Sequence, residues 1–336
     1  FVAVTTVAYG PLVGEHAKAP SKTAAVRAVL ALVIFAGAAA LTPSSANRVA
    51  LADNVRLIFL EQAPVLGRAV EIAARIEPPE PYEAPAATTP VDAKGSLDAT
   101  GWDVLLITVD ALRADHVGAY GYPRPTTPSL DALARDGVLF ERAYTATPHT
   151  SYAITSLMTG KYMRPLLAMG ADSETWAEHM RRYGYKTAAF FPPAVFFIDT
   201  ERFKSFDDRA LGFEYVRKEF LPASDRALQL ARYLAGEAGK GRVFAGVHPF
   251  EPHEPYEAHE GRDFGVRDID RYDAEIAEAD AAIGALVEAM RSRRPRTLVI
   301  VTADHGEEFG EHGGRYHGTT VYEEQVRVPL VVSAPG

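Results

Sequence analysis

The feature of this sequence that most limits its fold is the alternation of apolar and amphipathic segments after residue 101. Five segments have the length and apolar character of buried strands: 103–109, 186–191, 242–247, 297–302 and 328–333. Five others have the apolar spacing of helices: 128–135, 151–158, 173–182, 224–238 and 268–292. Near-continuous apolar strands that alternate with amphipathic helices are typical of parallel sheets. We therefore predict an α/β fold in which helices cover both faces of a largely parallel central sheet.

The segment before residue 101 differs in character from the rest. Residues 24–41 are an apolar run interrupted only by Arg27, and its length favours a transmembrane helix, although a signal-peptide region or a buried Ala-rich helix also fits. Residues 49–76 have the spacing of amphipathic helices. Residues 77–101 are rich in Pro and Ala and poor in large apolar residues, which predicts an exposed linker. The predicted organisation is thus a membrane-proximal segment at 1–48, amphipathic helices, a linker and a folded domain at 102–336.

The distribution of charge predicts a location and excludes one class of partner. Lys18, Lys22 and Arg27 slightly outweigh Arg48 and Arg56 on the far side of the apolar run, so the positive-inside rule places the folded domain outside the cytoplasm, tethered to the inner (cytoplasmic) membrane. The net charge of −9 argues against a nucleic-acid partner. An acidic chain can still bind an anionic ester where a metal ion dominates the local charge. Because the first residue is not Met and the last segment is strand-like, we interpret the chain as a fragment whose folded domain is incomplete at its C-terminus.

Acidic and imidazole side chains follow two of the predicted strands directly. Asp110 follows the strand at 103–109, and Asp304 and His305 follow the strand at 297–302 and Ala303. One isolated Asp in such a place more often caps a turn. Two such strand ends at the same edge of a parallel sheet, one with an adjacent imidazole, favour a site for a divalent cation such as Zn²⁺, Mn²⁺ or Mg²⁺.

A hydroxyl side chain precedes the helix predicted at 151–158. Thr150 stands at or next to the helix N-cap, where Thr commonly has only a capping role. The same position offers free backbone N–H groups and the positive end of the helix dipole, which stabilise an alkoxide or a bound anion. These residues alone leave both interpretations open.

Histidines gather in two loops that follow strands. His248 and His253 lie in a Pro-rich loop after the strand at 242–247, and His312, Arg315 and His317 lie in a Gly-rich loop after Asp304. One loop histidine is usually only solvated, but several at one end of a sheet indicate a site.

Six segments, taken in order, resemble the sulfatase family. They are DVLLITVDALRADHVGAYGY at 103–122, TTPSLDALARDGVL at 126–139, TSYAITSLMTGKY at 150–162, PHEPY at 252–256, TADHGEEFGEHG at 302–313 and YEEQVRVPLVVSAPG at 322–336. The resemblance covers roughly residues 102–336 and implies an alkaline-phosphatase-like fold with a catalytic role for this domain. It also implies one divalent metal ion (Zn, Mn, Mg or Ca) and roles for individual residues. The implied metal ligands are Asp110, Thr150, Asp304 and His305; the implied catalytic residues are Thr150, as nucleophile, and His253; and the implied substrate contacts are His253, Arg315 and His317.

Two departures from the family pattern bear on the chemistry. Sulfatases usually have a second Asp directly after the first, where this chain has Ala111, and they have a Cys or Ser, matured to formylglycine, where this chain has Thr150. A Thr at this position resembles the membrane-anchored phosphoethanolamine transferases and lipoteichoic acid synthases, whose catalytic domains are extracytoplasmic. That organisation agrees with an apolar run at 24–41.

The single hydroxyl of Thr150 distinguishes the mechanistic alternatives. Formylglycine hydrate releases sulfate by elimination from its second hydroxyl, whereas an ester of Thr150 must be resolved by direct attack of water or an acceptor. Phosphoryl transfer through a covalent intermediate does this readily. We therefore predict a metal-dependent hydrolase or transferase that acts on phosphate (or sulfate) esters of a lipid or glycan through a covalent Thr intermediate. The alternatives are a sulfate-ester hydrolase without formylglycine and a catalytically silent member that binds a glycan or lipid headgroup.

Overall fold

The structure is a computed structural model that describes residue 68 and residues 99–163, 173–196, 200–236 and 240–334. The transmembrane helix predicted at 24–41, the amphipathic helices at 49–76 and most of the linker at 77–101 lie outside the described residues. Among the residues that are described, no helix combines the length and the apolar character needed to cross a membrane. The helices and strands that follow belong to the compact unit Pro81–Gly336.

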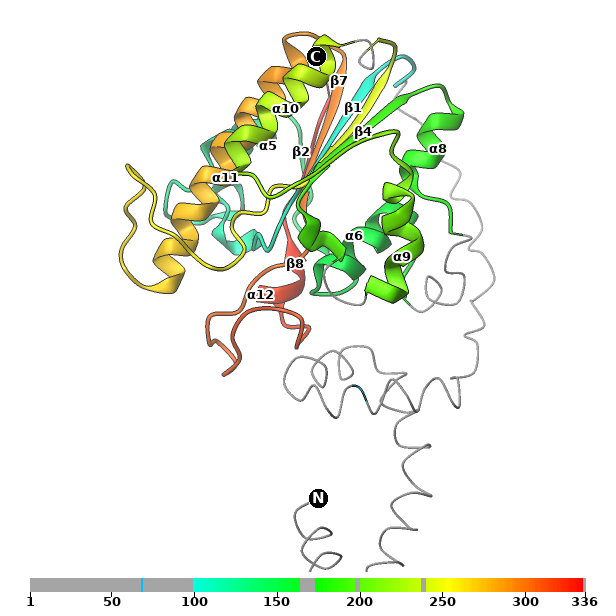
Figure 1. The fold of residues 1–336 in the computed structure, drawn as a ribbon. Coiled ribbons are helices and arrows are strands. Elements are labelled where there is room, and N and C mark those ends of the chain that lie inside the picture. The colour runs from blue at the N-terminus through cyan, green and yellow to red at the C-terminus, as the bar shows by residue number, and fades with distance from the viewer. Residues whose placement is uncertain (1–67, 69–98, 164–172, 197–199, 237–239, 335–336) are drawn as a thin grey trace, which may run out of the picture. The chain divides into compact units, whose positions relative to one another are not determined.

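A central sheet of seven strands organises the described part of the chain (Figure 1). Five neighbouring strands run parallel in the order β7 (Thr297–Ala303), β1 (Asp103–Val109), β6 (Val243–Val247), β4 (Lys186–Phe191) and β5 (Tyr215–Lys218). Two more strands extend the β7 edge in antiparallel fashion, β9 (Leu330–Ser333) and then β2 (Val138–Leu139). The prediction of an α/β fold with a largely parallel sheet is confirmed.

The central position of β1 explains its sequence. β1 pairs with β6 on one side and β7 on the other, and all seven of its residues are buried. A strand between two neighbours and beneath helices on both faces has no solvated side, so it is apolar almost throughout. Its N-terminal Asp103 is the exception, and the backbone N–H of Val243 and the guanidinium of Arg294 donate to this carboxylate.

Helices cover both faces of the sheet (Figure 1). One face carries α5 (Pro128–Arg135), α10 (Ala223–Ala235) and α11 (Asp268–Arg291), and the other carries α6 (Thr150–Thr159), α8 (Trp176–Arg182) and α9 (Thr200–Asp208). α11 has the apolar stripe expected from its sequence, and the stripe residues Ile276, Ala279, Ile283, Leu286 and Met290 are buried in the main core.

The last predicted strand differs from the structure. Residues 328–333 are divided between β8 (Arg327–Val328), which pairs with β3 (Ala143–Tyr144) in a small separate sheet, and β9. Pro329 separates the two strands, and its missing N–H cannot contribute to a continuous ladder. The short helix α12 (Glu323–Val326) precedes β8.

Candidate active site

The predicted metal ligands gather at the carboxyl edge of the central sheet. Asp110 follows β1, and Asp304 and His305 follow its neighbour β7. Thr150 is the first residue of α6, with His149 at the N-cap. All four side chains are buried, and the parallel strands bring residues almost two hundred positions apart to one point.

His305 Nε2 lies at the centre of this group. It is 3.0 Å from Thr150 Oγ1, 3.3 Å from Asp304 Oδ2 and 3.6 Å from Asp110 Oδ1. Asp110, Asp304 and His305 each place one potential ligand atom within 4.8 Å of the others. The structure therefore brings Asp110, Thr150, Asp304 and His305 together as one cluster, which we call the metal-ligand cluster.

The hydrogen bonds of the cluster leave its inward-facing atoms as acceptors. His305 Nδ1 is 2.9 Å from the carbonyl oxygen of Gly306, and because a carbonyl only accepts, Nδ1 carries the proton and Nε2 carries the lone pair. Burial lowers the pKa of His305 to about 4, so the ring is neutral. Asp304 Oδ1 accepts from the backbone N–H groups of Ala111 and His305, at 3.1 and 2.9 Å, which leaves Oδ2 directed at the cluster.

Each of the two carboxylates in this cluster has one buried oxygen without a hydrogen-bond donor among the described residues. Within the described residues, neither Asp110 Oδ1 nor Asp304 Oδ2 has a hydrogen-bond partner, although both are buried. Burial raises the pKa of Asp304, and the charge of Asp110 raises it further, which expresses the repulsion between the two groups. Buried acceptors that face one another are costly unless a cation lies among them. Two carboxylates, an imidazole and a hydroxyl are a donor set that fits a divalent metal ion.

A row of rings lies on the next loops along this edge. His317 stacks on His305 with ring centroids 4.1 Å apart, His253 meets His317 edge to face at 4.9 Å, and Phe250 stacks on His253 at 4.7 Å. His253, Glu254 and His317 also bring potential ligand atoms within 4.8 Å of one another. The two predicted substrate-contacting histidines thus lie beside the metal-ligand cluster.

The hydrogen bonds and charges around His253 favour a protonated ring, which can donate a proton. Its Nδ1 is 2.8 Å from the carbonyl oxygen of Glu254 and therefore carries a proton. Burial disfavours the charged ring, but the carboxylates of Asp110 and Glu254 outweigh burial, so the pKa of His253 is raised. His253 is thereby biased toward the doubly protonated form.

Arg315 is not brought to the cluster. Its exposed guanidinium pairs with the carboxylate of Asp268, at the first residue of α11, and lies over the ring of Tyr316. Its guanidinium thus binds a carboxylate outside the metal-ligand cluster, and its contact with substrate stays a prediction.

Two residues of the site carry no role in the sequence-based prediction. His248, at the end of β6, holds Nε2 3.4 Å from Asp110 Oδ2 and Nδ1 2.9 Å from Thr108 Oγ1. Glu307 is fully buried and accepts from His317 Nδ1 at 3.0 Å and from the Tyr256 hydroxyl at 2.8 Å. Burial raises the pKa of Glu307 to about 7. The position of His248 directly after a strand was the available signal, but only the strand order shows that β6 lies next to β1.

Ala111 replaces the second carboxylate of the usual family pattern with a backbone contact. It is fully buried and has a φ of 55°, an unusual value for a residue other than glycine. This conformation directs its N–H to Asp304 Oδ1. The position orients a predicted ligand through the main chain and contributes no ligand of its own.

A largely parallel α/β sheet with helices on both faces is a fold of the alkaline-phosphatase type, and here a hydroxyl, two carboxylates and an imidazole lie at its carboxyl edge. The family model described as Sulfatase matches residues 103–336. The chain belongs to the sulfatase family.

Individual relatives fall into both sulfatases and transferases. An "Ulvan-active sulfatase" of Formosa agariphila is 25% identical over 292 residues, which cover 70% of this chain and 56% of that protein. A "Putative transferase YhbX" of Escherichia coli is 26% identical over 257 residues, which cover 70% of this chain and 44% of that protein. The chain thus spans about half the length of these curated relatives.

A solved structure shares the fold. The C-terminal periplasmic domain of EcEptC from Escherichia coli superposes with a TM-score of 0.59 at 18% identity, covering 71% of this chain and 74% of that one. The same domain has also been solved in complex with Zn, with a TM-score of 0.59 at 17% identity and the same coverage.

Proposed function

We propose that this chain carries the catalytic site of a metal-dependent hydrolase or transferase that acts on phosphate esters through a covalent ester of Thr150. The observation that carries the proposal is the position of Thr150. Its hydroxyl lies at the N-terminus of α6 and 3.0 Å from His305 Nε2, inside the same buried group as Asp110 and Asp304. A hydroxyl that only capped a helix would not need two buried carboxylates and an imidazole around it.

The metal-ligand cluster would hold one divalent cation, which we take to be Zn, Mn, Mg or Ca. The neutral imidazole of His305 favours Zn among these, because hard cations prefer oxygen ligands alone. The Zn complex of the similar periplasmic domain supports this choice. When bound, a divalent cation lowers the pKa of a hydroxyl beside it and offsets the charge of an anionic ester.

Thr150, His253 and His317 then have separate roles in a two-step transfer of the phosphoryl group. Thr150 Oγ1, as the alkoxide whose proton has passed to water, attacks phosphorus while the bond from phosphorus to the leaving oxygen breaks, and the leaving oxygen takes a proton from His253. His317, which is held by Glu307, stacks on His305 and meets His253 edge to face, contacts the non-bridging oxygens. In the second step, water or an acceptor alcohol gives a proton to His253 as its oxygen attacks phosphorus, and the bond from phosphorus to Thr150 Oγ1 breaks.

The substrate is an anionic ester, and Thr150 favours phosphate over sulfate. An ester of its single hydroxyl cannot be released by elimination, so it must be displaced directly, which phosphoryl groups allow readily. A relative named as an ulvan-active sulfatase supports an ester of a glycan, and an ester of a lipid headgroup stays the other expected class.

Chromogenic esters test this proposal. The metal-loaded chain is incubated with p-nitrophenyl phosphate, bis(p-nitrophenyl) phosphate and p-nitrophenyl sulfate, and nitrophenolate release is followed together with intact mass. We expect release from a phosphate ester and an adduct that peptide mapping places on Thr150. Release from the sulfate ester alone would instead support a sulfatase that works without formylglycine. A metal-loaded chain that neither reacts nor forms an adduct would support a catalytically silent binding protein.

We also propose that the protein is tethered to the inner membrane with this domain outside the cytoplasm. The apolar run at 24–41 and the basic residues before it support this arrangement. A reporter enzyme that matures only outside the cytoplasm, fused after Gly101, is expected to be active in intact cells. The same fusion without residues 24–41 is expected to be inactive. A fusion that is inactive with the run in place contradicts the predicted topology.

A further inference from the structure

The turn after Asp110 is held from outside the metal-ligand cluster by a tyrosine of α11. The fully buried hydroxyl of Tyr272 donates to the carbonyl oxygen of Ala111 at 2.6 Å and accepts from the backbone N–H of Arg113 at 2.9 Å. Both partners lie in the turn whose Ala111 has the positive φ of 55°. A turn in such a conformation persists only where its surroundings hold it.

The same turn also holds a predicted metal ligand. The N–H of Ala111 donates to Asp304 Oδ1 at 3.1 Å, while the carbonyl of Ala111 accepts from Tyr272. Ala111 therefore links the α11 tyrosine to a carboxylate of the cluster. A displacement of the Tyr272 hydroxyl would be transmitted to Asp304 through this one residue.

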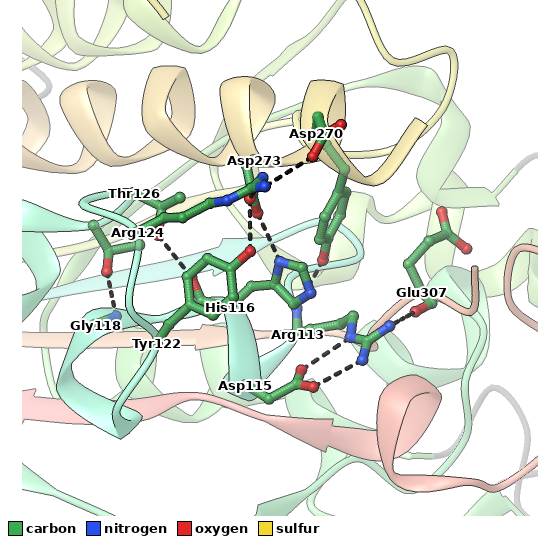
Figure 2. A network of polar contacts seen from close by, with 12 residues as sticks. Arg113, Asp115, His116, Gly118, Tyr122, Arg124, Thr126, Asp270, Asp273 and Glu307 are labelled. Carbon is green, nitrogen blue, oxygen red and sulfur yellow. Dashed lines mark hydrogen bonds and ion pairs between the residues drawn. The ribbon is translucent and has the colours of Figure 1, made fainter. Parts of the chain in front are cut away.

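Arg113 connects this turn to the turn after β7, as Figure 2 shows. Its buried guanidinium binds Asp115 with two hydrogen bonds of 2.9 and 2.8 Å, which fix its orientation. The remaining nitrogen, Nη1, donates to the carbonyl oxygen of Glu307 at 3.0 Å and to Glu311 Oε1 at 2.5 Å. Glu307 lies two residues after His305, so Arg113 ties the two ligand-bearing turns together.

We infer that Tyr272 and Arg113 are positioning residues that hold the two turns of the metal-ligand cluster at the separation a cation needs. The inference rests on the proposed function, because it assumes that the cluster binds a metal. Ligand atoms must keep their places within about half an ångström for strong binding. Both side chains act through the backbone of their turns, which carries the ligands.

The change of Tyr272→Phe removes the hydroxyl and keeps the ring, which packs against Tyr256 and Phe309. We expect the apo chain with this change to bind Zn²⁺ about tenfold or more weakly, since loss of a partner behind metal ligands typically costs 10–100-fold in affinity. Competition with a chelating dye measures the affinity. The visible spectrum of the Co²⁺-loaded chain reports the ligand geometry and is expected to change as well.

Tyr120→Phe is the matched control. The hydroxyl of Tyr120 also bridges two backbone groups, donating to the carbonyl oxygen of Phe140 at 2.8 Å and accepting from the N–H of Leu330 at 2.9 Å. Phe140 directly follows β2 and Leu330 begins β9, so these groups lie outside the ligand-bearing turns. We expect the control to lose similar thermal stability without any change in Zn²⁺ affinity or in the Co²⁺ spectrum.

A second variant tests the other half of the pair. Arg113→Lys keeps the charge but cannot bind Asp115 and the carbonyl of Glu307 at the same time, so it is also expected to weaken Zn²⁺ binding. Zn²⁺ affinity equal to that of the unmodified chain in both Tyr272→Phe and Arg113→Lys would overturn the inference, as would an equal loss in Tyr120→Phe. An unmodified chain that binds no Zn²⁺, Mn²⁺, Mg²⁺ or Ca²⁺ would contradict the proposed function itself, and with it this inference.

Discussion

Replacement of Asp304 by asparagine is expected to remove the bound metal. The unmodified chain should then be more stable than the variant with excess metal, but not in the presence of a chelator. The asparagine Oδ1 can still accept from the N–H groups of Ala111 and His305. Its Nδ2 replaces the carboxylate oxygen that lies 3.3 Å from His305 Nε2 and can donate to that lone pair. The substitution therefore keeps the local hydrogen bonds while it removes one of two repelling charges and one ligand.

The expected result has two parts. Elemental analysis should find that metal content falls from about one ion per chain to a small fraction of that. Thermal unfolding with excess metal should show the unmodified chain as the more stable one, by up to about 2.7 kcal/mol where the free metal is about a hundred times its Kd. In the presence of a chelator, the Asp304→Asn chain should be at least as stable, because one of two buried carboxylates that repel each other has been removed.

Asp273→Asn provides the control, because Asp273 is also fully buried but belongs to a different network. Its carboxylate accepts from His116 at 2.7 Å and from Tyr122 and Arg124 at 2.6 Å each (Figure 2). The Asp273→Asn change should lower the free energy of unfolding by about 3 kcal/mol with or without metal, because a buried charge network is broken. Its metal content should stay unchanged. Equal metal content in Asp304→Asn and the unmodified chain would contradict the assignment of Asp304.

The elements that could be predicted from sequence are those whose packing leaves a strong pattern. β1 and α5 have the predicted bounds, because the first is buried on both faces and the second has a regular apolar spacing. β5 and α9 do not follow from the sequence pattern. β5 is a half-exposed edge strand with the sequence YVRK, and the nine residues of α9 present only Phe203 and Phe206 as apolar side chains.

The site shows the same division between local pattern and tertiary contact. Asp110, Thr150, Asp304 and His305 lie in segments with recognisable motifs, so the family resemblance groups them from the sequence alone. The sequence places His248 among the loop histidines without a role of its own, and Tyr272 has no such motif. Their roles depend on the place of β6 beside β1 and on the packing of α11 against the turn after Asp110, and the contact from Tyr272 to Ala111 spans 161 residues.

Arg315 shows that the place of a residue within a motif does not give the direction of its side chain. It lies between the predicted site residues Asp304 and His317 in the sequence, yet its exposed side chain pairs with Asp268, outside the metal-ligand cluster. In a loop without regular structure, neighbouring residues do not share a direction, so a place within a motif predicts proximity of the backbone only. The direction of a loop side chain follows from its partners, which the sequence does not identify.

Replacement of Thr150 by alanine is expected to abolish turnover and leave the fold nearly intact. The hydroxyl is the proposed nucleophile, and its loss should lower turnover at least about a thousandfold, as for other covalent catalysts. Stability should change by no more than about 1 kcal/mol, because the methyl group of alanine is accepted at the first turn of α6. Steady-state rates with the phosphate esters, thermal unfolding and intact mass measure these effects. The covalent adduct should be absent.

Two further variants decide whether the nucleophile is Thr150 or the adjacent Ser151. Thr150→Ser keeps a hydroxyl at the same position and should retain a measurable part of the activity and the adduct. Ser151→Ala removes the adjacent hydroxyl and should retain most of the activity, because the hydroxyl of Thr150 is the one that lies 3.0 Å from His305 Nε2. Loss of activity in Ser151→Ala together with normal turnover in Thr150→Ala would place the nucleophile at Ser151. Normal turnover in both variants would exclude a covalent mechanism at the N-terminus of α6, because each of the two hydroxyls that begin this helix would then be dispensable.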